Sequence, residues 1–310
     1  FNSNHIANGF NNIALSSKQK AVCDELAWDC EGNLHRQPSS QHLVAWMALC
    51  GYLCSGQPID SFAAVNPDWG WWHEVGHNTV PRYMTQTFTN AAGKGAGCGT
   101  ECDNNILASA SAMRLYDLTN GAEDINGWAS DHRYLYNKIA EFRNQGLTGE
   151  ALRQAMYNDL WVGTGQPHAA MRAVHFQIGF IYARSRLNQT QATSQDTLEF
   201  FGLVARGNRL VDNTWTEANK AQFGMGRFND KKINNHDLFY VLSSRVIGRD
   251  MRKIFAMYGL PVSETALGSI ADLGLPMQDE VFYALPNSGA NMLKQGQWLD
   301  FSGAVPTYPY

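Results

Sequence analysis

The sequence lacks an excess of charge of either sign. Lysine and arginine (24) nearly balance aspartate and glutamate (28), and charged residues make up only 17% of the 310 residues. Proteins that bind nucleic acid or anionic membranes usually carry a basic excess, so neither partner is expected. There is also no uninterrupted apolar run of about 18 residues, so no membrane span is predicted. Hydrophobic residues make up 44%, which is enough for a substantial core.

Cysteine is absent after the first third of the chain. The six cysteines are Cys23, Cys30, Cys50, Cys54, Cys98 and Cys102. Their even number and short spacings, without a CxxC or Cys/His zinc pattern, predict three local disulfides and hence a secreted, extracellular protein. The alternative is reduced, buried cysteines in a cytosolic protein. A bond between Cys50 and Cys54 would require the helix to break near Gly51.

The sequence also begins without a methionine or a charged-then-apolar leader. We expect either a processed product or a piece of a longer protein, and favour the piece, because residues 1–10 resemble the end of a polar connector. Residues 1–310 are predicted to form a single catalytic domain, acting as a monomer within that larger chain. A break near 117–130 would divide the domain into two lobes.

Strand patterns are rare, so the expected fold class is mainly α with minor β-structure. Two segments after Pro276, 279–289 and 297–303, are the candidates for strands, and the glycine-rich segment 90–99 is predicted to be a loop. Apolar spacing, caps and breaks predict the helices. These are 16–30, 39–53, 69–80, 100–117, 131–144, 149–161, 166–186, 194–204, 215–223, 235–246, 249–258 and 263–273.

His73, Glu74 and His77 form a His-Glu-x-x-His pattern within the predicted helix 69–80. Residues four apart share one helical face, so the two imidazoles can bind one zinc ion. Glu74 lies about 100° further round the axis, which lets it act as general base toward a water molecule instead of binding the metal. Gly76 would let another backbone approach this helix closely. The alternative is a helix with two ordinary surface histidines.

A catalytic zinc ion needs a third protein ligand and one open position. Val80 and Tyr83 stand where a metzincin would have Gly and His, which excludes that class. No histidine occurs between His77 and His132, and Glu101 opens the helix that follows the glycine-rich loop. Glu101 is therefore the predicted third ligand.

Residues around Glu101 suggest how it is held. A disulfide between Cys98 and Cys102 would fix the loop that carries it, although such a bond could equally serve stability alone. Asn104 and Asn105 could orient Glu101 or bind the backbone of a substrate. Helix capping and solvation are the alternative roles for the two asparagines.

Two segments resemble the enhancin-like, mucin-degrading zinc peptidases. The first is WWHEVGHN, followed after a spacer by ECDNNI; the second is 237–263, in which S…GRD…F…GxPVS recurs. Within the group, the nearest likeness is to secreted bacterial O-glycopeptidases. The resemblance implies a gluzincin-type catalytic domain with one zinc ion, which cleaves O-glycosylated host proteins beside glycosylated Ser or Thr. Thr79 and Val80 depart from the family, whose members often have Gln shortly after the first motif.

A polar stripe follows one face of the predicted helix 166–186. Its members are His168, Arg172, His175 and Tyr182. If the stripe faces the zinc ion, His175 or Tyr182 would stabilise the negative charge of the transition state, and His168 and Arg172 would contact substrate. The alternative is a solvated helix face.

Trp69, Trp71 and Trp72 precede the zinc-binding pattern and could stack on sugar rings. Buried anchoring of the helix is their more common use. Two other functions remain open: a zinc endopeptidase that does not depend on glycans, and a non-catalytic glycan-binding module with a structural metal. The presence of Glu74 favours an enzyme, because a structural site has no use for a general base.

Overall fold

The computed structural model describes residues 2–10, 13–32, 73, 76, 79–89, 92, 95–96, 100–121, 128–163, 165–287 and 292–310. The predicted helix 39–53 and most of the predicted helix 69–80 lie outside these residues. The described helices are α1 Asn2–Ala7, α2 Ser17–Leu26, η3 Arg82–Met84, α5 Thr100–Leu118, α6 Trp128–Asn144, α7 Gly149–Met156, η4 Tyr157–Trp161, α8 Pro167–Ser185, α9 Ser194–Thr214, η5 Lys220–Phe223, α10 Asn235–Ile247, α11 Arg252–Met257, α12 Glu264–Ala271 and α13 Met292–Gln295. The described strands are β1 Phe88–Thr89, β2 Gly95–Ala96, β3 Val281–Ala284 and β4 Gln297–Asp300.

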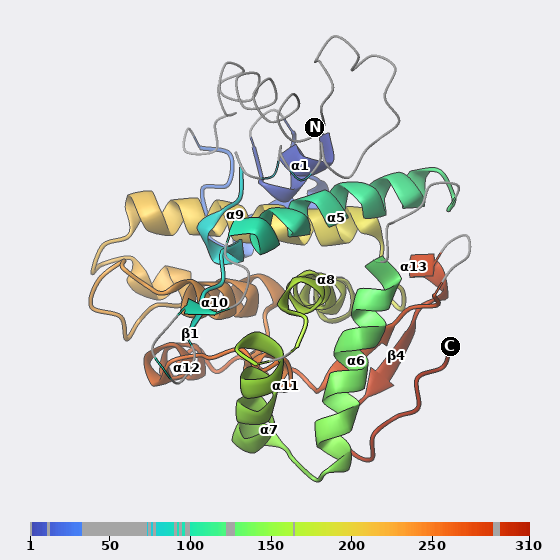
Figure 1. Cartoon of the computed structure of the whole chain (residues 1–310). Coiled ribbons are helices and arrows are strands. Elements are labelled where there is room, and N and C mark those ends of the chain that lie inside the picture. Colours follow the sequence, from blue (N-terminus) through green and yellow to red (C-terminus); the bar gives the residue numbers. More distant parts are fainter. Residues whose placement is uncertain are drawn as a thin grey trace.

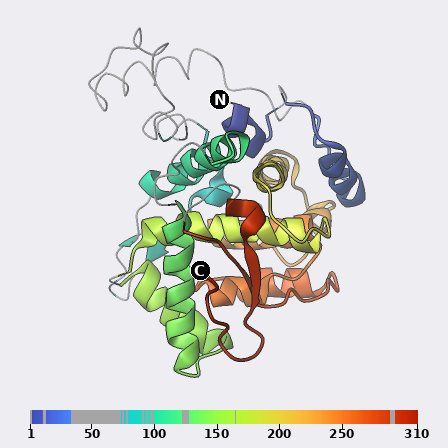
Figure 2. The same cartoon turned by 90° about the vertical axis from the view of Figure 1, so that its right-hand side faces the viewer.

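Helix α8 runs through the middle of the molecule. Fourteen of its nineteen residues are buried, so almost every face of the helix is covered by another element. It packs against α5, α6, α9, α10 and β3. Helices α5 and α9 lie on one side of α8, and α7, α11 and α12 lie on the other (Figures 1 and 2). Residues from both sides of the 117–130 segment contribute to one hydrophobic core.

The mainly α fold is confirmed, and β-structure is minor among the described residues. Strands β3 and β4 form an antiparallel hairpin, with Phe282 opposite Leu299, in the two segments predicted after Pro276. The prediction of a loop at 90–99 is wrong at Gly95–Ala96. These two residues pair antiparallel with Phe88–Thr89, because a backbone that turns back on itself can satisfy its N–H and C=O groups in a short ladder.

Helix α9 corrects another prediction, because it continues ten residues past the predicted end at 204. The sequence there is polar and contains Gly207, which weakens a helix by about 1 kcal/mol relative to alanine. Tertiary contacts override that preference. A Cβ at Gly207 would lie 2.7 Å from the ring of Trp28, and the Asn208 side chain accepts a hydrogen bond from the Tyr83 backbone N–H at 3.1 Å. The predicted helix 215–223 is mostly absent. Only its last four residues are helical, as η5.

The prediction that residues 1–10 form a polar connector is wrong. Residues 2–7 form α1, which packs against α9 and α5 with Ile6 and Ala7 buried. Two arginines of α9 then bind backbone carbonyls in the part of the chain before α5. Arg209 donates to Gly9 O at 3.0 Å, and Arg206 donates to Phe10 O at 3.3 Å and to Cys30 O. Burial lowers the pKa of both guanidinium groups to about 10.

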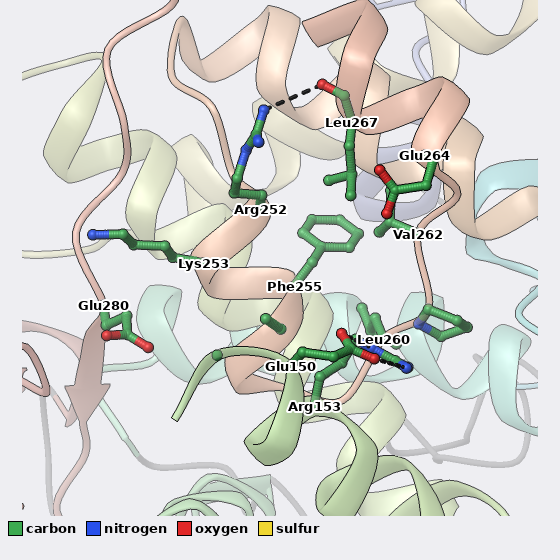
Figure 3. Close-up of a pocket in the computed structure, with 13 residues that line it drawn as sticks. Glu150, Arg153, Arg252, Lys253, Phe255, Leu260, Val262, Glu264, Leu267 and Glu280 are labelled. Carbon is green, nitrogen blue, oxygen red and sulfur yellow. Dashed lines mark hydrogen bonds and ion pairs between the residues drawn. The ribbon is translucent and has the colours of Figure 1, made fainter. Parts of the chain in front are cut away.

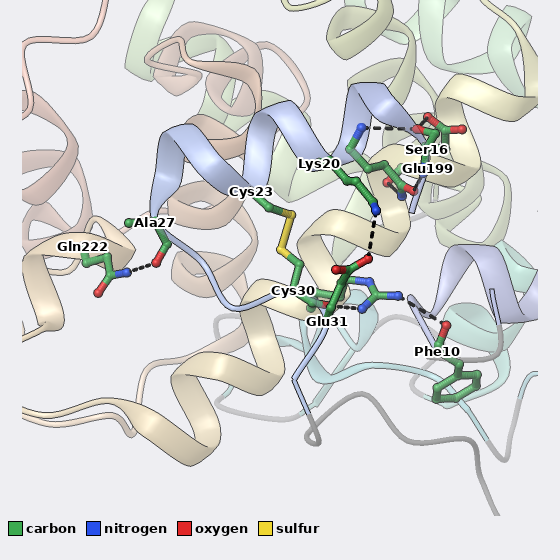
Figure 4. The surroundings of a disulfide bond; sticks show 11 residues. Phe10, Ser16, Lys20, Cys23, Ala27, Cys30, Glu31, Glu199 and Gln222 are labelled. Carbon is green, nitrogen blue, oxygen red and sulfur yellow. Dashed lines mark hydrogen bonds and ion pairs between the residues drawn. A yellow bond between two sulfur atoms is a disulfide. The ribbon is translucent and has the colours of Figure 1, made fainter. Parts of the chain in front are cut away.

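Cys23 and Cys30 form a disulfide, which confirms one of the local bonds predicted from the spacing. The bond ties the last turns of α2 to the chain that follows, and the Lys20–Glu31 ion pair at 3.4 Å lies beside it (Figure 4). Helix α2 begins as predicted at a serine cap, because Ser16 and Gln19 form a capping box. Among the described helices, none is long and apolar enough to cross a membrane.

Removing this disulfide should lower stability measurably. The Cys23→Ala/Cys30→Ala double variant is expected to lose about 2–3 kcal/mol of unfolding free energy, because a loop of this length restricts the unfolded chain by about that amount. The midpoint of urea unfolding would report the change. An unchanged midpoint would mean that the contacts of Arg206 and the Ser16 cap hold this segment without the bond.

Candidate metal centre

The ring of His73 is held by the second turn of α5. Its Nδ1 lies 2.7 Å from Oδ1 of Asn105, which is 9% exposed. An amide oxygen can only accept a hydrogen bond, so Nδ1 must carry the proton and donate it. The lone pair of the neutral imidazole is then on Nε2. Metal-binding histidines are commonly oriented in this way, with one nitrogen bonded to protein and the other directed at the metal.

The backbone near His73 is also packed tightly against α5. Asn104, which is fully buried, donates from Nδ2 to the His73 carbonyl at 3.0 Å. A Cβ added to Gly76 would lie 2.9 Å from both the Cβ and the carbonyl oxygen of Asn104. The prediction that Gly76 admits a close backbone is therefore confirmed. The approaching backbone is the helix that begins at Thr100 and carries Glu101.

Asp103 completes a row of three consecutive anchoring residues. One of its carboxylate oxygens accepts from the Thr85 hydroxyl at 2.7 Å, and the other accepts from the Asn104 backbone N–H at 2.9 Å. Asp103 is 3% exposed. This role was not predicted from the sequence. Three successive polar residues at the start of an otherwise apolar helix were the available indication.

The remaining predicted ligands cannot be placed around the ring. Glu74 and His77 lie outside the described residues, as does the side chain of Glu101. Among the residues that are described, no group of three or more His, Cys, Asp or Glu is arranged to hold a metal ion. The backbone of Glu101 belongs to α5, one helical turn before Asn105, so the two positions share a helix face. The imidazole of His73, oriented by the Asn105 amide, is suited to bind zinc.

The start of α8 approaches the same part of α5. Cys102 is fully buried and disulfide-bonded, and its Sγ lies 3.3 Å from Nδ1 of His168. The partner cysteine is not among the described residues, so the predicted pairing with Cys98 stays a prediction. His168 itself is exposed. His168, one of the four residues of the polar stripe, therefore lies beside Cys102, the residue that follows Glu101.

Arg172 is occupied by an ion pair within the protein. Its Nε lies 2.7 Å from Oδ2 of Asp131, which is in the first turn of α6. Burial raises the pKa of the Asp131 carboxyl to about 6, although the adjacent Arg172 opposes this rise. The Arg172 side chain is 18% exposed. Its predicted role as a clamp for a substrate carboxylate would require it to share or leave Asp131, a partner that sequence spacing did not reveal.

His175 and Tyr182 lie in the hydrophobic core. His175 donates from Nδ1 to the Met171 carbonyl at 2.8 Å and stacks on Phe239 with ring centroids 4.5 Å apart. Tyr182 packs on Phe200, and burial, reinforced by nearby carboxylates, raises its pKa well above the usual value. The alternative that the stripe is a solvated face is wrong at these two positions, because α8 is central. Their role as transition-state stabilisers stays a prediction.

The buried histidines should make the protein sensitive to acid. Burial lowers the pKa of His175 to about 4 and that of His132 to about 3. The unfolded chain takes up protons below pH 6.5, while the folded chain does not, so stability falls as the pH drops from 6.5 toward 4. One pKa unit corresponds to about 1.4 kcal/mol, so His175 alone would account for a loss of up to about 3 kcal/mol.

The measurement compares the free energy of urea unfolding at pH 7 and pH 4.5. His175→Leu should reduce the difference between the two values, because leucine fills a similar volume and does not titrate. Val174→Ala, a neutral substitution at a buried position on the same helix, should lower stability equally at both values. An unaltered pH dependence in His175→Leu would contradict the assignment.

A hollow lies away from the His73 site. It encloses about 380 Å³ between α7, α11, α12 and the chain near Glu280, with Phe255 and Leu260 among the apolar side chains and Arg252 and Glu264 at the rim (Figure 3). These helices lie across α8 from α5 (Figure 1). Of the predicted site residues whose side chains the structure describes, none lines it.

Comparison with known proteins identifies one curated relative. The immunomodulating metalloprotease of Pseudomonas aeruginosa is 27% identical over 314 residues, which cover 96% of this chain and 32% of the relative. No protein-family profile matches the chain. The predicted resemblance to bacterial zinc peptidases of this group is confirmed as a likeness to a bacterial metalloprotease.

Solved structures of IMPa show the same fold. The IMPa metallopeptidase from Pseudomonas aeruginosa aligns with a TM-score of 0.75 and 21% identity, and IMPa in complex with an O-glycopeptide aligns with 0.75 and 23%. A third structure, IMPa in complex with T-antigen, gives 0.74 and 21%. Each alignment covers 100% of this chain and 34% of the other chain. The chain thus spans about a third of the length of these relatives.

Proposed function

We propose that this chain is the catalytic part of a secreted zinc endopeptidase that cleaves O-glycosylated proteins beside glycosylated Ser or Thr. The observation that carries the proposal is the contact between His73 and Asn105. It brings the helical segment of the His-Glu-x-x-His pattern against the helix that carries Glu101, and leaves Nε2 of His73 as the nitrogen with the lone pair. Likeness to a metalloprotease along almost the whole chain supports it.

The proposed ligands are His73, His77 and Glu101, which together provide two neutral imidazoles and one carboxylate. Gly76 lies between the two histidines, and its lack of a side chain lets α5 approach to van der Waals contact. A bound zinc ion would supply a Lewis acid that polarises the scissile carbonyl and acidifies a water molecule. The anchors at Asp103, Asn104 and Asn105 would keep the two helices in fixed relative positions through the reaction.

Glu74 is proposed as the general base and acid. It would accept a proton from the attacking water and then donate that proton to the nitrogen of the leaving amine. The transferred proton compensates the charge that develops on the departing group. Glu74 follows His73 directly in the sequence, so in the predicted helix its carboxylate would be offset from the imidazole around the axis and would not compete for the metal.

O-glycosylated substrates are proposed on the likeness to IMPa, of which one solved structure is a complex with an O-glycopeptide and another a complex with T-antigen. His168, which is exposed beside Cys102, is proposed to contact the substrate. Trp69, Trp71 and Trp72 are proposed as sugar-stacking residues, and Arg172 as a further contact. Host glycoproteins are the expected substrates, and the disulfide Cys23–Cys30 supports secretion.

The proposal can be tested on the purified chain. Zinc content is measured by elemental analysis, and cleavage is followed by mass spectrometry with a mucin-type glycoprotein as substrate. A matched sample of the same glycoprotein, stripped enzymatically of its O-glycans, is run in parallel. We expect bound zinc, cleavage of the intact glycoprotein and little cleavage of the stripped one. Equal cleavage of both would leave a zinc endopeptidase without glycan dependence. Binding without cleavage would indicate a glycan-binding module.

A further inference from the structure

We infer that Asn105 is a positioning residue that fixes the orientation of the His73 ring and the nitrogen that it directs at the metal, and that it does not bind substrate. The inference rests on the proposed zinc site and assigns to Asn105 a role within it. The 2.7 Å contact between Nδ1 and Oδ1 is short for an N–H···O hydrogen bond, and Asn105 is nearly inaccessible to solvent. A side chain so enclosed is poorly placed to contact a polypeptide in a cleft.

The direction of the hydrogen bond decides which nitrogen remains available for a metal. A neutral imidazole has one N–H and one lone pair, and either nitrogen can carry the proton. Because the Asn105 amide oxygen has no proton to give, the bond forms only when Nδ1 of His73 is protonated. The Asn105 side chain therefore stabilises the form in which Nε2 carries the lone pair. Without this bond, the ring could populate both neutral forms. Zinc would then bind more weakly, because only one of these forms has its lone pair on Nε2.

The same helix turn also fixes the main chain of His73. Asn104 donates to the His73 carbonyl at 3.0 Å, while Asn105 accepts from the ring. Consecutive asparagines thus hold one residue at two points, its backbone and its side chain. Asn104 is itself held by the Asp103 carboxylate, which accepts the Asn104 backbone N–H and the Thr85 hydroxyl. The ring is thus oriented through a connected set of hydrogen bonds.

Substitutions at Asn105 can distinguish the hydrogen bond to His73 from a simple packing contact. Many metal-binding histidines use a carboxylate in the same position. Replacing Asn105 by aspartate keeps an oxygen acceptor at the same distance along the side chain, whereas replacing it by alanine removes the acceptor. If the hydrogen bond is what matters, the aspartate variant should preserve the zinc site and the alanine variant should not.

The experiment measures zinc affinity by competition with a chromogenic chelator in the wild-type chain, Asn105→Ala, Asn105→Asp and Asn137→Ala. Asn137 is exposed in the middle of α6 and serves as the matched control. We expect Asn105→Ala to weaken zinc binding by about 10- to 100-fold. Asn105→Asp and Asn137→Ala should stay close to wild type. Unchanged affinity in Asn105→Ala, or an equal loss in Asn105→Asp, would overturn the inference.

A second readout needs no metal. Nitrogen-15 spectra of histidine-labelled, zinc-free protein should show the His73 ring protonated at Nδ1 in the wild type, and a mixture of the two neutral forms in Asn105→Ala. A wild-type ring protonated at Nε2 would also overturn the inference. Neither readout involves proteolysis. A chain that binds zinc but cleaves nothing would therefore contradict the proposed function, while the zinc affinities still decide the role of Asn105.

Discussion

Glu74→Gln is expected to retain zinc while losing nearly all cleavage of an O-glycosylated protein. Glutamine has the shape of glutamate but cannot accept the proton of the attacking water or deliver it to the leaving amine. Proton transfer by a positioned side chain typically contributes about 10²- to 10⁴-fold to the rate, and the proposed mechanism uses Glu74 in both transfers. A fall in kcat of at least about a thousandfold is expected on that basis.

The test reports zinc content, kcat and thermal stability for the same preparations. Glu141→Gln, in an exposed part of α6, is the matched control and should behave as wild type. Zinc retained together with lost cleavage would show that Glu74 acts on the reaction. Zinc lost together with cleavage would instead make Glu74 a metal ligand. Activity close to that of Glu141→Gln would refute the proposed general base.

Gly76→Ala is expected to reduce cleavage much more than it reduces stability. The added methyl group would lie 2.9 Å from the carbonyl oxygen and the Cβ of Asn104, and 3.2 Å from its Cα. Backbone atoms cannot rotate away, so the two helices must separate. Overpacking of this kind costs about 1–3 kcal/mol, while alanine returns about 1 kcal/mol of helix propensity. The net change in unfolding free energy should therefore be small.

The effect on catalysis should be larger because the separation changes the position of His73 relative to α5. A misplacement of about 1 Å at a reacting centre can cost about 100-fold in rate. We expect a loss of cleavage of that order in Gly76→Ala, accompanied by weaker zinc binding. Gly226→Ala is the matched control, because a Cβ at Gly226 would meet nothing within 4 Å. Equal activity in the two variants would show that the close approach at Gly76 does not matter to the site.

Local sequence patterns predicted the elements that local forces determine. The predicted helix 100–117 differs by one residue from the observed α5, the predicted helix 235–246 differs by one residue from α10, and the serine cap expected at the start of the predicted helix 16–30 is Ser16. Periodicity and capping depend on residues within one or two helical turns, so they can be predicted from the sequence. The two segments expected to supply β-structure, 279–289 and 297–303, contain β3 and β4, although their pairing was not predicted.

Tertiary contacts explain the features that the sequence did not predict. Helix α9 continues past its polar stretch because Arg206 and Asn208 find buried partners far away in sequence. The contact between His73 and Asn105 joins residues 32 positions apart, and no spacing rule selects Asn105 over Asn104. His175 looked like a cleft residue because its helix has polar positions on one face. Only the packing of α10 against α8 shows that Phe239 covers the ring.

The arginines of α9 hydrogen-bond to the main chain of the N-terminal segment, and Arg209 also lies over the ring of Phe10, 5.3 Å from its centroid. Arg206 and Arg209 donate to the carbonyl oxygens of Phe10 and Gly9, atoms that every amino acid possesses. These hydrogen bonds therefore tolerate changes of side chain, whereas the buried Ile6, Ala7 and Phe10 still need apolar side chains. Gly9 is the exception, since its φ is +59° and a Cβ there would meet Gly202 O at 2.5 Å. Homologous sequences should then show a constrained glycine at position 9 and apolar residues at positions 6, 7 and 10, with the exposed positions free to vary.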